Sequence, residues 1–197
     1  HEQMGDELFN ENMLENLLDL RDRVLRPGGR ILPAKFRLFV EPVSFNNSMR
    51  VRRFWNTELP DNIDLSAMEL SVAAAPFQSD RFEQLWARPG AVAATIGTPQ
   101  PILEFDLHSL ADVGELPKHH EAARVATSDA IVDGLCVWFE AIFDEETTLS
   151  TSPLAPLTSW CNRVFRIDRE ISKGETLHFH VSMERLIDAS TWIVQAA

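Results

Sequence analysis

The sequence predicts a mainly β fold, an antiparallel barrel or sandwich, preceded by a single helix near the N-terminus. Beyond residue 77, short apolar segments of strand length alternate with Pro and Gly turn signals. Residues 7–25 instead carry apolar side chains at three- and four-residue steps, which is the period of a helix. The composition, 45% hydrophobic and 24% charged, is ordinary for a folded domain.

The expected helix over 7–25 has one apolar and one polar face. Its cations gather at the C-terminal end, as the helix dipole prefers, and Pro27-Gly28-Gly29 ends it. A short apolar strand is expected next, at 30–33. Together they resemble the end of an α/β unit, whose strand would need parallel neighbours. The pattern changes after Pro33, where residues 35–43 alternate. We therefore expect a domain boundary that separates 1–33 from 34–197.

Residues 46–76 read as an insertion into the β-rich part. A turn at Asn46-Asn47 leads to a patch of basic and aromatic residues, and 64–75 has room for a short helix. Such a patch can serve nucleic acid or a protein interface. Because the formal net charge is −12, we expect these arginines to meet carboxylates, and the segment to be a helical arm used in dimerisation. The patch comprises Arg50, Arg52, Arg53, Phe54 and Trp55.

Strands are expected throughout the remainder of the chain. The segment 134–143 has two apolar faces and is predicted to be buried on both sides. The other expected strands are 91–96, 102–108, 121–127, 161–167, 176–185 and 190–195.

The bulk properties exclude several classes of protein. The acidic balance argues against a nucleic-acid partner, and no apolar run approaches the length of a membrane span. The 2 cysteines do not form a disulfide framework, which suits a cytoplasmic or nuclear protein. The chain starts at a histidine inside a predicted loop, so we expect a piece of a longer protein.

No metal or cofactor site is expected within this chain. The pairs His119-His120 and His178–His180 lack an evident third ligand. No glycine-rich phosphate or dinucleotide loop is present.

Two carboxylates near the N-terminus are the first candidates for chemistry. Glu2 and Glu11 lie on a short segment that runs into the expected helix. Fixed carboxylates can grip both edges of a guanidinium, whose planar fork donates to two oxygens at once. The alternative is that acids before a helix simply suit its positive end.

A second motif, at residues 149–160, supports the interpretation of Glu2 and Glu11 as a binding site. Residues 149–160 hold two prolines among small hydroxyl residues and end at Trp160, which by itself is read as a core residue. This segment resembles the Ser-Thr-Ser-Pro-x-x-Pro-x-Thr-His-Trp loop of protein arginine methyltransferases, and the opening resembles their double-glutamate loop. The matching residues are Ser150 to Pro153, Pro156, Thr158, Trp160, Val164 and Phe165, with Glu2, Met4, Gly5, Leu8, Phe9, Glu11 and Met13.

The resemblance implies an architecture and a function. Residues 1–33 would be the C-terminal remnant of an S-adenosylmethionine-binding α/β domain of the class I type. Residues 34–197 would be the β-barrel domain, with the dimerisation arm at about 46–76. The chain would be the substrate-binding and dimerisation part of a methyltransferase that acts on arginine in a protein or peptide. By itself it is expected to be inactive.

The same resemblance assigns roles to five residues. Glu2 and Glu11 would be catalytic and hold the substrate guanidinium, while Met4 and Trp160 would shape its pocket. Ser159 would line the pocket where the family has a histidine, and serine cannot accept a proton near neutral pH. An alternative function follows from Ser159: a catalytically silent barrel that dimerises with an active partner and regulates it.

Overall fold

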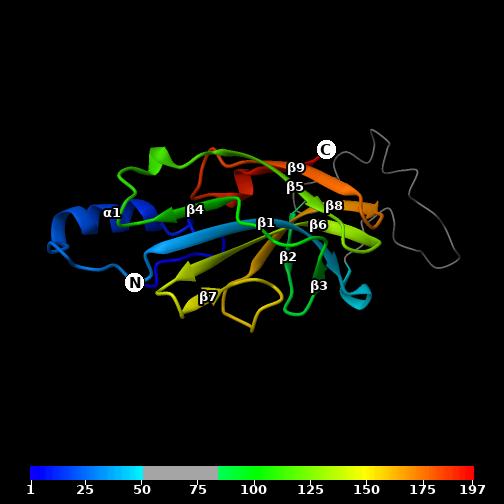
Figure 1. Cartoon of the computed structure of the whole chain (residues 1–197), viewed down its shortest axis with the longest axis horizontal. Helices are drawn as coiled ribbons and strands as arrows, with labels where there is room; N and C mark the ends of the chain where they lie inside the picture. The colour runs from blue at the N-terminus through cyan, green and yellow to red at the C-terminus, as the bar shows by residue number, and fades with distance from the viewer. Residues whose placement is uncertain (51–83) are drawn as a thin grey trace, which may run out of the picture.

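The computed structural model describes residues 1–50 and 84–197, and the fold is mainly β with one N-terminal α-helix, as predicted (Figure 1). The helix is α1 (Met13–Val24). Short 3-10 helices are η1 (Asn47–Met49), η5 (Val113–Glu115) and η6 (Ala189–Thr191). The strands are β1 (Lys35–Phe45), β2 (Gln84–Ala87), β3 (Val92–Thr95), β4 (Leu103–Asp106), β5 (His119–Val125), β6 (Ala130–Ile142), β7 (Thr148–Ser150), β8 (Asn162–Ile171), β9 (Thr176–Ser182) and β10 (Ile193–Ala196).

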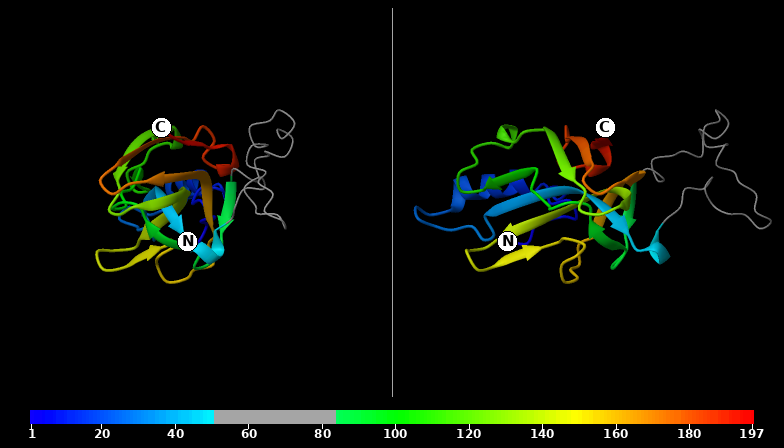
Figure 2. Two further views of the ribbon diagram at one scale, coloured as in Figure 1. Left: turned by 90° about the vertical axis from the view of Figure 1, so that its right-hand side faces the viewer. Right: turned by 45° about the vertical axis from the view of Figure 1, so that its right-hand side comes forward.

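Two antiparallel sheets are arranged around a shared interior (Figure 2). The larger sheet runs in the order β2-β8-β6-β1-β3, with β4 also paired to β1 and β7 to β6. Its centre is the long β1–β6 pair, in register from Lys35 opposite Ile142 to Val43 opposite Gly134. The smaller sheet has the order β10-β9-β5. The strands predicted at 35–43 and between residues 91 and 195 all form, whereas β2 and β7 were not predicted.

The largest core draws on both sheets and on the opening segment. Met4, Leu8, Phe9 and the inner face of α1 are buried with apolar side chains from β1, β4, β6 and β9. Phe9 stacks on Phe105 of β4 with ring centroids 6.0 Å apart. The opening segment therefore contributes to the core beneath the sheets, and the division into domains at residue 33 stays a prediction.

Two expectations about local structure were wrong. The helix begins at Met13 and not at residue 7, because residues 1–12 form turns in which Leu8 and Asn12 have positive φ values of 75° and 53°. Residues 30–33 form no strand, since no strand of the described chain pairs with them. Instead the carbonyl of Leu32 accepts a 2.8 Å hydrogen bond from the amino group of His1.

Most of the predicted arm at 46–76 lies outside the described residues. The part that is described supports one expectation: the guanidinium of Arg50 pairs with the carboxylate of Asp133, with Nε 2.5 Å from Oδ1. No helix within residues 1–50 and 84–197 has the length and apolar character needed to cross a membrane.

The two sheets are joined by a buried ion pair. Arg124 of β5 donates from Nε to Glu41 of β1 at 2.7 Å and from its Nη2 atom to the carbonyl of Gln100 at 2.8 Å. The backbone N–H of Gln100 in turn donates to Glu41 at 2.8 Å. Burial raises the pKa of Glu41, against the opposing effect of Arg124.

Candidate active site

Residues 1–11, which we name the two-glutamate loop, fold back on themselves. Successive backbone hydrogen bonds, such as Leu8 N–H to the Gly5 carbonyl at 2.9 Å, form its turns. A Cβ at position 5 would lie 1.8 Å from the Asn10 Oδ1 atom, so a larger residue there would displace the Asn10 side chain. The Gln3 side chain donates to the Glu11 carbonyl at 2.8 Å and thus ties the start of the loop to its end.

The two predicted catalytic carboxylates lie at the ends of this folded loop. Glu2 and Glu11 are both exposed. Neither carboxylate has a hydrogen-bond or ion-pair partner among the described residues. The geometry therefore leaves both groups available to a cationic ligand, while their catalytic role remains a prediction.

The second predicted element, the segment 149–160, lies at the end of β7 and in the loop 151–161, which we name the proline loop. Its start is fixed by Thr151, whose buried Oγ1 accepts a 3.0 Å hydrogen bond from the Phe139 N–H. Its end is fixed by Asn162, whose side chain donates to the Thr151 carbonyl at 2.9 Å. These bonds hold both ends of the loop against β6.

The structure brings the two loops together at Trp160. The indole Nε1 of Trp160 donates to the Met4 carbonyl at 2.7 Å, across 156 positions of sequence. Its ring also packs edge-on against Phe139, with centroids 5.8 Å apart. Trp160 is therefore both a core residue and the contact between the two motifs that the sequence singled out.

Two of the five predicted site residues, Ser159 and Trp160, line the same pocket. A pocket of about 410 Å³ is lined by residues 87–90 and the proline loop, including Ser159 and Trp160. Met4 of the two-glutamate loop is buried, and neither it nor Glu2 nor Glu11 lines this pocket. Ser159 is exposed.

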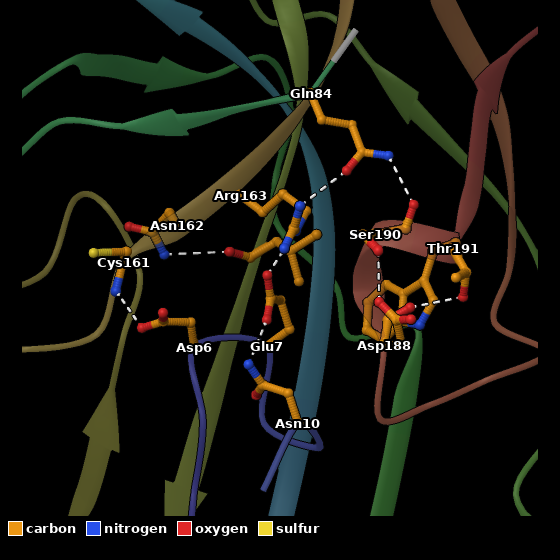
Figure 3. Close-up of polar contacts among 12 residues, drawn as sticks. Asp6, Glu7, Asn10, Gln84, Cys161, Asn162, Arg163, Asp188, Ser190 and Thr191 are labelled. Atoms are coloured by element: carbon orange, nitrogen blue, oxygen red, sulfur yellow. Dashed lines mark hydrogen bonds and ion pairs between the residues drawn. The ribbon is translucent and has the colours of Figure 1, made fainter. Parts of the chain in front are cut away.

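Two acidic residues of the loop were not predicted to contact the barrel, yet they do (Figure 3). Asp6 accepts a 2.7 Å hydrogen bond from the Cys161 backbone N–H. Glu7 is buried, with Oε1 2.6 Å from Nε of Arg163 and Oε2 2.9 Å from Nδ2 of Asn10. Burial raises the pKa of Glu7, against the effect of Arg163. The available signal was an acidic residue immediately before the apolar pair Leu8-Phe9.

Arg163 extends this contact towards the neighbouring strand β2. Its Nη1 donates to Oε1 of Gln84 at 2.9 Å, and its guanidinium lies 4.5 Å from the ring centroid of Trp86. The Gln84 amide in turn donates to the Ser190 carbonyl at 3.2 Å (Figure 3). The guanidinium of Arg163 thus links Glu7 to Gln84 of β2, and the Gln84 side chain continues this link to Ser190 of η6.

A match to a protein-family model shows which family this chain belongs to. The family model described as the arginine methyltransferase oligomerization subdomain matches residues 34–190, which is most of the chain. The chain belongs to the protein arginine methyltransferase family. It corresponds to the C-terminal domain of these methyltransferases.

Curated relatives agree with this assignment. Protein arginine N-methyltransferase 6 of Danio rerio is 28% identical over 85% of this chain and 48% of its own length. The Arginine N(omega)-methyltransferase of Streptomyces achromogenes subsp. streptozoticus is 28% identical over 86% of this chain and 44% of its own length. The chain therefore spans about half the length of these arginine methyltransferases.

Solved structures of arginine methyltransferases share the fold. The PRMT1 enzyme–prozyme heterotetrameric complex of Trypanosoma brucei, solved with AdoHcy, matches with a TM-score of 0.67 and 24% identity. That match covers 92% of this chain and 56% of the other. The crystal structure of PRMT6 matches with a TM-score of 0.62 and 20% identity, over all of this chain and 65% of the other.

The family implies S-adenosylmethionine, and the described residues do not by themselves fit it. The chain holds no glycine-rich cofactor loop, and Gly5 of the two-glutamate loop packs against Asn10 of that same loop. The apolar face of α1 is buried in the barrel core. In the described part of the chain no group of three or more His, Cys, Asp or Glu side chains is placed to hold a metal ion.

Proposed function

We propose that this chain is the acceptor-binding and oligomerisation part of an S-adenosylmethionine-dependent protein arginine N-methyltransferase. Glu2 and Glu11 would hold the guanidinium of the substrate arginine. The observation that carries the proposal is the 2.7 Å hydrogen bond from Trp160 to the Met4 carbonyl, because it places the two-glutamate loop beside the proline loop.

The chemistry of the two-glutamate loop suits this role. A guanidinium is a planar cation with five N–H donors, and it is best held by carboxylates that have no other partner. Glu2 and Glu11 meet that condition within the described residues, whereas Asp6 and Glu7 are already used by the barrel. Positioning of the acceptor nitrogen would then supply much of the rate.

Ser159 limits what this site does with the proton of the acceptor nitrogen. A serine hydroxyl cannot carry a positive charge or take up a proton near neutral pH. The proton would therefore leave to water or to a carboxylate, and the proposal does not depend on residue 159.

The expected partners follow from the same assignment. We propose an arginine-containing protein or peptide as substrate, and a homodimer formed through the arm at 46–76. Support comes from the oligomerization subdomain that matches residues 34–190 and from the heterotetrameric assembly of the Trypanosoma brucei neighbour.

Methyl transfer by the full-length protein tests the proposal. Labelled S-adenosylmethionine and an arginine-containing peptide would be assayed with the wild type, Glu2→Gln and Glu11→Gln. Loss of one carboxylate should lower kcat/KM by roughly 100-fold, since it removes half of the grip on the guanidinium. Glu15→Gln, an exposed acid of α1, is the matched control and should behave as the wild type. Unchanged methylation in Glu2→Gln and Glu11→Gln would refute the assigned roles.

A further inference from the structure

The start of β8 and the residues just before it hold the two-glutamate loop at three points. Trp160 donates to the Met4 carbonyl. The Cys161 N–H donates to Asp6, and Arg163 pairs with Glu7 (Figure 3). The contacts follow the same order on the two segments. The two-glutamate loop therefore runs alongside residues 160–163 over several positions and does not contact them at a single point.

The pair of Glu7 and Arg163 is largely shielded from solvent. The side chains are 2% and 15% exposed, and each Glu7 oxygen has a donor, Arg163 on one side and Asn10 on the other. Arg163 itself is fixed by the Gln84 amide and by the Trp86 ring. A guanidinium held from three sides gives Glu7 a rigid partner.

The backbone beside Glu7 needs such a partner. Leu8 is fully buried and has φ at 75°, a conformation that a bulky side chain adopts only when its surroundings impose it. Glu7 immediately precedes Leu8, so fixing its carboxylate also fixes this turn. The turn sets the path of the chain between Glu2 and Glu11.

We propose that Glu7 and Arg163 are positioning residues, which hold the two-glutamate loop in the shape that presents Glu2 and Glu11 to one guanidinium. The expected effect on the kinetics rests on the proposed function. The expected effect on the order of the loop does not depend on it. The competing explanation is that the pair only contributes to overall stability.

The test compares two arginines of the same strand in the full-length protein. Arg163→Met removes the proposed positioning contact. Arg169→Met removes the 2.8 Å pair between Arg169 and Glu175, which lies away from the loop and serves as the control. Amide hydrogen exchange is followed over residues 4–9, and steady-state kinetics are measured with an arginine-containing peptide.

Arg163→Met should speed exchange over residues 4–9 and raise KM for the peptide by roughly tenfold, with KM for S-adenosylmethionine unchanged. Arg163→Lys should recover part of the loss, because its ammonium can still reach Glu7. The near-isosteric Glu7→Gln should show the same defect, and the double variant should be no worse than either single one, since the two residues act as a unit. If Arg163→Met does not fold, Glu7→Gln decides.

Equal exchange and equal peptide KM in Arg163→Met and Arg169→Met would overturn the proposal, as would additive losses in the double variant. One further outcome would distinguish failure of the proposed function from failure of the positioning role. If the wild type methylates no arginine but exchange over residues 4–9 still responds to Arg163→Met alone, the proposed function fails and the positioning role stands.

Discussion

Among the ion pairs of the described residues that join distant parts of the chain, two are built differently from each other. Glu41 and Arg124 connect the two sheets, with side chains that are 0% and 6% exposed. Their remaining hydrogen bonds go to backbone groups, those of Gln100 and Ala123. Glu7 and Arg163 connect the two-glutamate loop to β8, and their remaining partners are the side chains of Asn10, Gln84 and Trp86.

The difference separates a contact that holds the fold from one that holds a site. Backbone groups are placed by the sheets themselves, so the pair between Glu41 and Arg124 is complete whenever the barrel is folded. Side chains such as Asn10, which is exposed, can be replaced or reoriented without unfolding the barrel. We therefore expect loss of the first pair to lower global stability and loss of the second to loosen a loop.

The largest effect should come from Arg124→Met. It leaves the carboxylate of Glu41 buried without its cation, and removal of one partner from such a pair typically costs ~3–5 kcal/mol of unfolding free energy. Urea unfolding at neutral pH measures this loss. A loss no larger than that of Arg163→Met would break the distinction between the two pairs.

An intermediate effect concerns pH. Burial raises the pKa of Glu7 above its ordinary value of 4.5, against Arg163 and with a smaller contribution from the charge of Asp6. The folded state thus binds this proton more tightly than the unfolded state does. The stabilising contribution is complete below pH 4.5 and is lost as the pH rises through the raised pKa.

Glu7→Gln should remove this dependence. Relative to the wild type, its unfolding free energy should improve as the pH rises from below 4.5 towards neutrality. Urea unfolding at several pH values measures the difference. A difference that stays constant, or that changes in the opposite direction, would contradict the raised pKa.

The smallest effect is expected at an exposed pair on α1. Arg23 and Asp19 are 2.7 Å apart, but their side chains are 70% and 56% exposed. Solvent screens such pairs, so Arg23→Ala should change the unfolding free energy by less than ~0.5 kcal/mol. Exchange over residues 4–9 should also stay as in the wild type. A larger change in either measurement would show that exposed pairs matter here as much as buried ones.

Much of the fold could be predicted because strand alternation is a local property. The alternating segment at 35–43 became β1, and the doubly apolar segment at 134–143 became most of β6. The helix start was misplaced because residues 8 and 9 continue the apolar period of α1, although Leu8 and Asn12 turn the chain out of helical geometry. The strand expected at 30–33 did not form, because a strand needs a neighbour to pair with.

The candidate site also has a part that could be predicted from local sequence and a part that could not. The two loops could be located from motifs whose residues lie within a few positions of one another, and these motifs include Glu2, Glu11 and Trp160. The contacts of Trp160 with Met4 and of Glu7 with Arg163, each across 156 positions, became known from the folded chain alone. The physical reason is that an ion pair depends on which strand a loop lies against, and that choice is made by packing of the whole core.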